Sequence, residues 1–142
     1  MTDVVDRDTR SRIMSKIRSR DTHPELMVRS MLHRSGLRFR VNDRGLPGRP
    51  DVVLKRWNAA VFVNGCFWHR HPRCRYASMP SSNVAFWRTK FRQNVLRDRR
   101  SQKALVDAGW RVFVVWECEV TDARIRQLAR SIKRGSHGAS SR

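Results

Sequence analysis

The chain has 142 residues and a formal net charge of +19, with 31 Lys and Arg against 12 Asp and Glu. This length suits one domain with a core of its own. So basic a surface indicates a polyanionic partner, and nucleic acid is the first candidate.

Membrane association and a disulfide framework are both disfavoured. No apolar run approaches the roughly 20 residues of a membrane-spanning helix, and no signal-peptide pattern opens the chain. A basic protein lying on a membrane surface is a competing class, but the cationic residues are spread over every segment. Three cysteines cannot all pair within the chain, so reduced cytoplasmic thiols or metal ligands are favoured.

Residues 8–20 place Met14 and Ile17 among Arg, Lys and Ser. This segment is too polar to be a core helix. We expect either a short helix that lies on an anionic surface or an arm that is disordered in the free protein.

A helix is predicted from Thr22 to Gly36. Thr22 can cap it, Pro24 fits its first turn and Glu25 completes a capping box. Glu25 therefore has a full structural explanation before any functional one. The predicted buried stripe consists of Leu26, Val28, Met31 and Leu32.

Three short strands are predicted next, at residues 37–41, 51–54 and 59–63, as an antiparallel meander. Residues 42–50 form a Gly- and Pro-rich loop between the first two. The second strand opens on a carboxylate, Asp51.

A long helix is predicted over residues 83–108, with Trp87, Phe91 and Val95 on one face. Residues 110–116 form the strongest strand pattern, apolar enough for a central strand buried on both faces. A helix between two strands favours a parallel connection. A basic helix over residues 122–133 and a disordered Gly/Ser tail complete the chain.

Residues 64–74 read N-G-C-F-W-H-R-H-P-R-C and concentrate the chemistry of the chain. Sulfur and imidazole ligands at these spacings can wrap one zinc ion. The alternative is three buried free cysteines and a surface histidine. His69 competes with His71 for the ligand role, and we favour His71 because it is closer to Cys74. The predicted ligand set is Cys66, His71, Cys74 and Cys118.

Asp51 and His69 are candidates for hydrolysis. A carboxylate that opens a strand beside a Gly/Pro loop can hold Mg²⁺, and a nearby histidine can accept a proton from water. The competing interpretation makes Asp51 a turn residue.

Phe67, Trp68 and Trp87 are aromatic residues in a very basic chain. Phe67 and Trp68 are adjacent, so both are not expected to point into one core. Apolar side chains can also enter and unstack a base step, which is the functional alternative to a core position.

The chain resembles the very-short-patch-repair (Vsr) DNA mismatch endonucleases in several motifs that occur in the same order. These are M-S-K-I-R-S-R-D-T followed by Glu25, L-P-G-R-P-D ending at Asp51, N-G-C-F-W-H, F-W at residues 86–87, N-V-L-R-D-R-R, and G-W-R-V-F-V-V-W-E-C. The resemblance spans residues 9–118.

This resemblance implies a restriction-endonuclease-like α/β fold, with a mixed central sheet flanked by helices and a structural zinc site. It implies Mg²⁺-dependent nicking of one strand of double-stranded DNA beside a T:G mismatch. Asp51 and the carbonyl of Val63 would hold Mg²⁺, with His69 as general base and Glu25 and Asn64 in support. Cys66, His71, Cys74 and Cys118 would bind Zn²⁺. Phe67, Trp68 and Trp87 would enter the duplex, and Met14 and Ile17 would approach from the opposite groove.

The predicted organisation is a DNA-contacting arm at residues 1–20, an endonuclease domain at 21–134 and a tail at 135–142. We expect a monomer in the bacterial cytoplasm, associated with the nucleoid, without membrane contact and with mismatch-repair proteins as further possible partners. Two alternatives stay open: a restriction-like nuclease without mismatch preference, and a zinc-stabilised DNA-binding module without catalysis.

Overall fold

Helix α2 (His23–Arg34) is the first element of residues 22–135, the part of the chain that the computed structural model describes. The Thr22 hydroxyl caps it by accepting the backbone N–H of Glu25 at 3.5 Å. Val28 and Leu32 are fully buried, but Leu26 is 50% exposed, so the predicted stripe is wrong at that position. The buried face includes Glu25, because residues 25, 28 and 32 share one side of a helix and residue 26 does not.

The sheet has the order β1-β2-β3-β4. Strands β1 (Arg40–Val41), β2 (Val52–Leu54) and β3 (Ala59–Asn64) are antiparallel, and β4 (Arg111–Trp116) runs parallel to β3. The predicted meander and parallel connection are both confirmed, although β1 is shorter than predicted. Short 3₁₀ turns follow β2 (Lys55–Trp57) and β4 (Glu117–Glu119).

Strand β4 lies at the edge of the sheet and is half-buried, so the prediction of a central, fully buried strand is wrong. Only Val115 of this strand is buried, whereas all of β2 and β3 is buried. The apolar side chains of β4 still have partners, since Phe113 packs on one core and Val112 and Val114 pack on the other.

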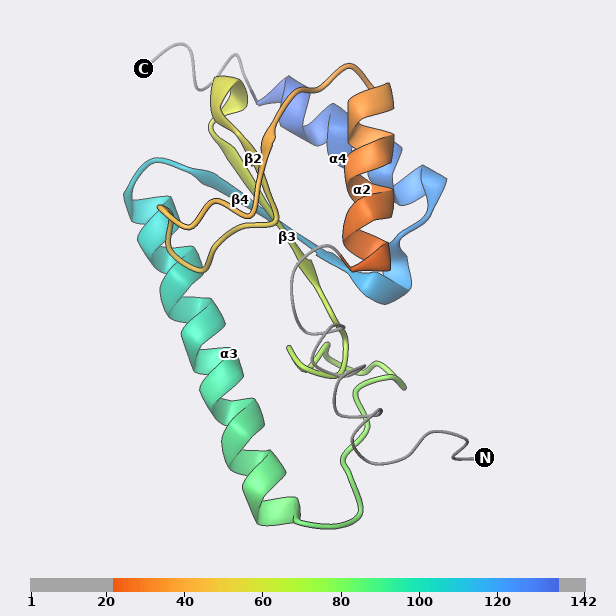
Figure 1. Ribbon diagram of the computed structural model, residues 1–142, viewed down its shortest axis with the longest axis vertical. Helices are drawn as coiled ribbons and strands as arrows, with labels where there is room; N and C mark the ends of the chain where they lie inside the picture. Colours follow the sequence, from red (N-terminus) through yellow and green to blue (C-terminus); the bar gives the residue numbers. More distant parts are fainter. Residues whose placement is uncertain (1–21, 136–142) are drawn as a thin grey trace.

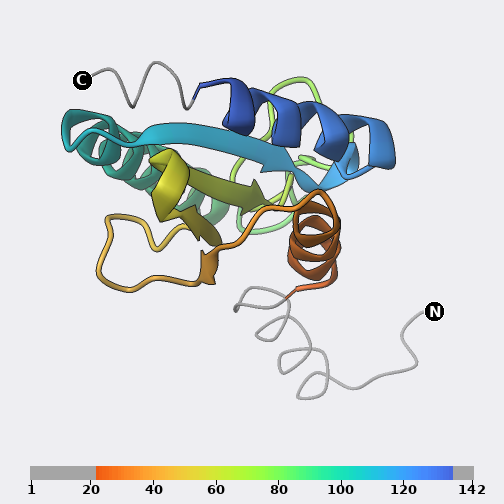
Figure 2. The same cartoon turned by 90° about the horizontal axis from the view of Figure 1, so that it is seen from above.

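Helices cover both faces of the sheet, as Figures 1 and 2 show. On one face, α2 and α4 (Asp122–Arg134) pack on Val61 and Val63 in the larger core. On the other face, the long helix α3 (Val84–Asp107) places Leu105 against Ala60 and Phe62. The side chains of β3 therefore alternate between two cores, as the period of a strand requires.

The loop before β2 packs directly on α3. Gly48 has a φ of +75°, and a Cβ atom there would lie 2.8 Å from Cβ of Ser101. Glycine is the residue that allows both this backbone and this approach.

The predicted N-terminal arm, with Met14 and Ile17, lies outside the described residues, as does the tail after Gly135. Across residues 22–135, every helix is too short or too polar to cross a membrane.

Candidate functional site: a cysteine–histidine cluster beside a carboxylate pair

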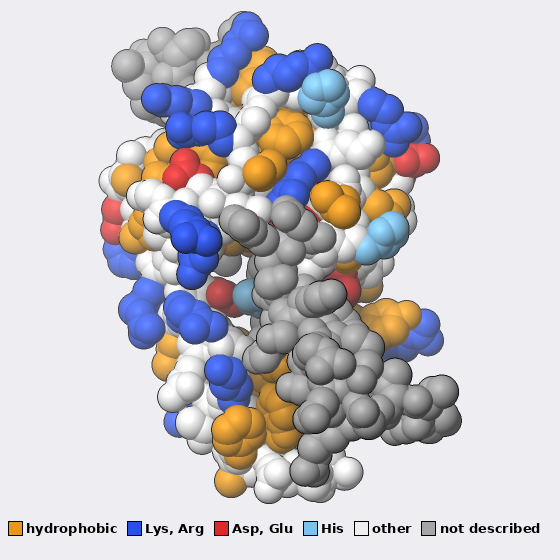
Figure 3. Space-filling view, viewed as in Figure 1, with side chains coloured by type: hydrophobic (Ala, Val, Ile, Leu, Met, Phe, Trp, Pro, Cys, Tyr) orange, Lys and Arg blue, Asp and Glu red, His pale blue; other side chains and the backbone are white. Residues whose placement is uncertain are grey.

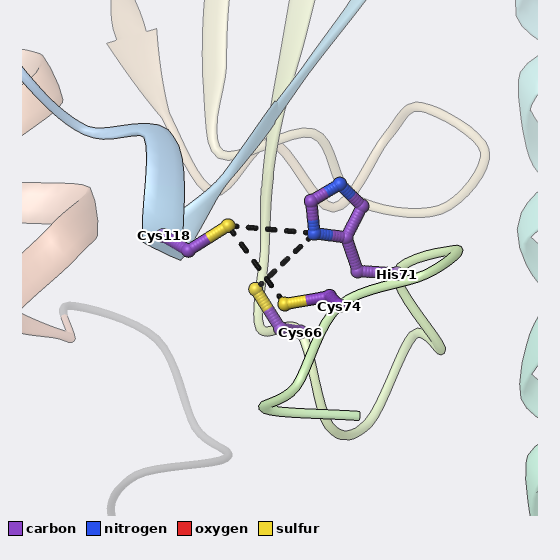
Figure 4. A group of neighbouring side chains, drawn as sticks. All are labelled: Cys66, His71, Cys74 and Cys118. Atoms are coloured by element: carbon purple, nitrogen blue, oxygen red, sulfur yellow. Dashed lines mark hydrogen bonds between the residues drawn. The ribbon is translucent and has the colours of Figure 1, made fainter. Parts of the chain in front are cut away.

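The four predicted zinc ligands meet at one point (Figure 4), with their ligand atoms all within 4.8 Å of one another. Three come from the loop after β3, and Cys118 comes from the turn after β4. His71 Nδ1 lies 3.6 Å from Cys66 Sγ and 3.4 Å from Cys118 Sγ. The sulfurs of Cys74 and Cys118 are 4.0 Å apart. His71, not His69, is therefore the histidine of the cluster.

These distances fit the edges of a zinc tetrahedron. Zinc bonds of about 2.3 Å to sulfur and 2.0–2.1 Å to nitrogen place two sulfurs about 3.8 Å apart and a sulfur and a nitrogen about 3.5 Å apart. Burial raises the pKa of the Cys66 thiol to about 12, so a thiolate there needs a positive partner, which a bound metal ion would supply. The cluster can hold a metal ion such as zinc.

The surroundings of the cluster orient its ligands. The His71 ring stacks on Trp116 with centroids 4.3 Å apart, and its Nε2 lies 3.9 Å from a carboxylate oxygen of Glu119. The Glu117 carboxylate accepts the backbone N–H of Cys66 at 3.0 Å. Carboxylates behind the ligands are typical of metal sites, where they fix the orientation of the ligating ring.

Asp51 lies immediately before β2, next to the backbone of β3. Its Oδ2 accepts the N–H of Val63 at 2.6 Å. Burial raises the pKa of Asp51 to about 7, and the negative charge of Glu25 adds to the rise, while the Val63 N–H opposes it. The charges of Arg29 and His69 also lower it. The charges of Glu25, Arg29 and His69 therefore all act on the Asp51 carboxyl group.

Arg29 connects Glu25 to Asn42, at the start of the loop that leads to Asp51. Its Nη2 donates to the Glu25 carboxylate and to the Asn42 side chain, each at 3.3 Å. The N–H of Asn42 in turn donates to the carbonyl of Asp51 at 3.3 Å. The negative charge of Glu25 acts on Asp51, and carboxylate oxygens are the ligands that Mg²⁺ prefers.

Asp98 is a site residue that the sequence reasoning missed. Its Oδ2 lies 2.6 Å from Nδ1 of His69, across 29 positions of the chain. The sequence did hold a signal, because Asp98 is the one acid among the arginines and lysines of residues 84–106. An acid on a basic helix that faces a histidine can fix its tautomer and leave Nε2 open to a water molecule.

Asn64 lies buried at the end of β3, one residue after Val63, and pairs in register with Trp116. A second asparagine, Asn94, is also buried and donates from Nδ2 to the Trp68 carbonyl at 3.1 Å. Asn94 and Asp98 are one turn apart on α3, so this helix holds Trp68 and His69 from the same side.

Phe67, Trp68 and Trp87 form one aromatic cluster outside the two cores of the domain. The Phe67 and Trp68 ring centroids are 4.9 Å apart, and the Trp87 centroid lies within 5.9 Å of both. All three are half-buried, and Phe86 beside them is 61% exposed. The cluster is therefore at the surface, next to His69.

Lys and Arg side chains are spread over the face shown in Figure 3, and acids are few on it. Helix α3 alone carries Arg88, Lys90, Arg92, Arg97, Arg99, Arg100 and Lys103. A positive surface around a carboxylate cluster is suited to a polyanion that is held by its phosphates and hydrolysed with a cation.

Comparisons with known proteins identify the family of the chain. The family model described as DNA mismatch endonuclease Vsr matches residues 2–75. The DNA mismatch endonuclease Vsr of Escherichia coli strain K12 is 47% identical over 118 residues, which cover 83% of this chain and 75% of the relative. The type II nicking enzyme V.XorIIP of Xanthomonas oryzae pv. oryzae is 44% identical over 133 residues, or 90% of this chain and 97% of the relative.

A third relative, the type II nicking enzyme V.NmeAIP of Neisseria meningitidis, is 41% identical over 138 residues, covering 94% of this chain and 98% of the relative. These relatives share most of their length with the chain, and the family model covers about half of it. The chain belongs to the DNA mismatch endonuclease Vsr family.

Proposed function

We propose that the protein is a Mg²⁺-dependent endonuclease that nicks one strand of double-stranded DNA beside a T:G mismatch. The observation that carries the proposal is the position of Asp51, between the Val63 N–H at 2.6 Å and the charge of Glu25, and within the electrostatic reach of the His69 that Asp98 holds. A DNA mismatch endonuclease needs a cation site, a base and a way to detect a faulty pair, and the proposal assigns these roles to Asp51, to His69 and to the aromatic cluster.

Asp51 and the carbonyl of Val63 would hold Mg²⁺, with Glu25 in support. Bound Mg²⁺ would polarise the phosphodiester and stabilise the charge that develops on it. His69 would accept a proton from the attacking water at Nε2, since Asp98 accepts the hydrogen bond at Nδ1. Asn64 would orient the water or the phosphate, because an amide can donate and accept but not titrate.

The cysteine–histidine cluster would hold a structural Zn²⁺, since four protein ligands leave no open position for substrate. Phe67, Trp68 and Trp87 would enter the duplex at the mismatch. Met14 and Ile17 of the arm at residues 1–20 would approach from the opposite groove. We further propose a restriction-endonuclease-like fold for the domain at residues 21–134, a monomeric enzyme, and recruitment by mismatch-repair proteins.

Nicking of otherwise identical oligonucleotide duplexes with a T:G or a C:G pair tests the proposal. The expected result is Mg²⁺-dependent cleavage of one strand of the T:G duplex alone, lost on addition of a chelator and in Asp51→Ala. Equal cleavage of both duplexes would instead indicate a restriction-like nuclease. Binding without cleavage, with Mg²⁺ present, would indicate a DNA-binding module.

A further inference from the structure

Arg70 occupies a position in the loop that neither the zinc cluster nor the hydrolytic residues explain. It lies between His69 and His71, and its φ of +54° is in the left-handed region. Non-glycine residues seldom adopt this backbone unless the surrounding structure holds it in place. The contacts of the Arg70 side chain stabilise this backbone conformation.

The guanidinium of Arg70 joins the two halves of the loop. Nη1 donates to the carbonyls of Phe67 at 3.0 Å and Ser78 at 3.2 Å, and Nη2 donates to the carbonyl of Ala77 at 2.6 Å. Backbone carbonyls on opposite limbs of the loop are thus held by one planar group. Lysine could not copy this, because a compact ammonium lacks the rigid fork of arginine.

The same guanidinium also joins the loop to α3. Its Cζ atom lies 3.9 Å from the ring centroid of Phe91 and 5.5 Å from that of Phe67. Phe91 in turn contacts Phe67 edge-on at 5.1 Å and stacks on Trp87 at 5.5 Å. Arg70 is therefore in contact with Phe67 and, through Phe91, with Trp87, two of the three rings of the aromatic cluster.

The zinc cluster anchors a different part of the loop. Its fourth ligand, Cys118, belongs to the turn after β4, so it ties the loop to the end of the sheet. Arg70 ties the loop to α3, on the side where the aromatic rings lie. Ala77 is also held near the cluster, because its N–H donates to the carbonyl of Cys74 at 3.0 Å, but it is Arg70 that joins Ala77 and Ser78 directly to Phe67.

We propose that Arg70 is a positioning residue for mismatch recognition: it holds the loop closed on Phe91 so that Phe67 and Trp68 meet the DNA in one arrangement. This rests on the proposed role of those rings at the duplex. When the rings are already ordered in the free protein, little of the binding free energy is spent on ordering them. The free-energy difference between T:G and C:G duplexes then depends mainly on the cost of unstacking the base step.

Arg70→Lys tests this while keeping the positive charge. We expect the ratio of T:G to C:G nicking rates to fall about 10–10²-fold, the scale of a small misplacement of positioning groups. 2-Aminopurine placed next to the mismatched thymine should lose the fluorescence increase that reports unstacking in the wild-type complex. Zinc content should stay at the wild-type value, and the variant should remain folded at the assay temperature even if the lost hydrogen bonds lower its melting temperature. Arg73→Lys is the matched control, because Arg73 is in the same loop, is exposed and also has a left-handed φ, of +55°.

Arg70→Gln provides a second variant in case lysine disturbs folding. Wild-type discrimination and unstacking in either folded variant would overturn the inference. Loss of zinc from both variants, or unfolding of both at the assay temperature, would also overturn it, since the loss of discrimination would then follow from a damaged fold. A smaller salt dependence of binding with an unchanged rate ratio would make Arg70 a phosphate contact instead. If the Trp68→Ala variant discriminates between T:G and C:G duplexes as well as the wild type does, the proposed role of the aromatic rings is wrong. If the Arg70→Lys variant does so and Trp68→Ala does not, only the proposed role of Arg70 is wrong.

Discussion

Asp98 and His69 are 2.6 Å apart, Oδ2 to Nδ1, although one lies on a long helix and the other in the loop after β3. The pair leaves Nε2 of His69 as the nitrogen free to take a proton from water. Both side chains are partly exposed, at 31% for His69 and 24% for Asp98, so a substrate can reach them. The helix thus supplies an orienting group to the base of the proposed reaction.

Asp98→Asn is expected to lower the single-turnover nicking rate by about 10²–10⁴-fold, the range for losing a positioned acid–base group. An amide at this position can donate to Nδ1 and so stabilise the unproductive tautomer. DNA affinity should stay the same or rise, because the change removes a negative charge from a DNA-binding surface. Rates and binding curves on the T:G duplex measure the two effects separately.

Asp107→Asn is the matched control, since Asp107 is exposed on the same helix and pairs with Lys103 at 2.9 Å. Exposed pairs of this kind contribute little to stability. The control variant should nick at the wild-type rate. An Asp98→Asn enzyme as fast as this control would show that His69 needs no orienting carboxylate.

The raised pKa of Asp51 predicts that the stability of the protein falls with rising pH when no divalent cation is present. This pKa of about 7 lies above the ordinary value of 3.8, so the folded state holds this proton more tightly than the unfolded chain does. The stabilisation is therefore present below about pH 4 and is lost as the pH rises through 7. Asp51→Asn should abolish nicking yet raise the melting temperature at pH 8 in the presence of a chelator.

Melting curves of both proteins from pH 5 to pH 8 check this expectation. The difference between them should grow with pH and shrink when Mg²⁺ is added, because a cation stabilises the ionised carboxylate of the wild type alone. A difference in melting temperature that stays constant from pH 5 to pH 8 would mean that burial does not raise the pKa of Asp51. Asp43→Asn, in the loop before β2 and paired with Arg40, is a suitable control.

The two histidines of the loop should separate zinc binding from catalysis. His71→Ala is expected to lose zinc and melting temperature together, because His71 Nδ1 lies within 3.6 Å of two cysteine sulfurs. His69→Ala should keep about one zinc per chain and lose most of its activity, by about 10²–10⁴-fold. Elemental analysis and nicking assays on the same samples give both quantities, and a His69→Ala protein without zinc would reverse the assignment.

Local features of the structure could be predicted from local sequence. Thr22 caps α2 as its position before Pro24 indicates, and the antiparallel meander follows from three short strands at close spacing. The cysteine–histidine cluster could also be predicted, because three of its four members lie in one nine-residue stretch. Each of these inferences depends on neighbours in sequence.

Features that depend on distant contacts were missed or wrong. An apolar strand such as β4 has the same sequence pattern at the edge of a sheet as at its centre. The position of β4 at the edge follows from its pairing with β3 alone, which the sequence pattern does not reveal. The exposure of Leu26 follows from Glu25 facing inward, toward Asp51 and Arg29. Arg70 gave no pattern, because an arginine on a basic chain has meaning only once its partners are known. Asp98 stands out in the sequence as a lone acid among basic residues, but its partner, His69, cannot be inferred from its position alone.

The proposed discrimination between T:G and C:G pairs cannot come from the positive surface, because the phosphates are the same in both duplexes. It must come from base edges or from the cost of deforming the DNA at the pair. Phe67, Trp68 and Trp87 form a surface cluster next to His69, so a ring from it can enter the duplex near the bond to be cut. Inserting a ring costs a few kcal/mol of unstacking, and less where the pair is already imperfect.

Trp68→Ala should therefore reduce T:G nicking far more than it reduces non-specific binding. Its backbone anchor, the bond from Asn94 to the Trp68 carbonyl, does not depend on the side chain, so the loop should stay in place. Trp87→Ala should act similarly, with a further loss of stability because the stacking of Trp87 on Phe91, at 5.5 Å, is removed.

Trp57→Ala is the control for the loss of a tryptophan in general, because Trp57 packs on the larger core and is not part of this cluster. Rates on T:G and C:G duplexes, with melting curves for each variant, measure the effect. A folded Trp68→Ala enzyme that still discriminates as the wild type does would mean that the mismatch is detected by another part of the protein.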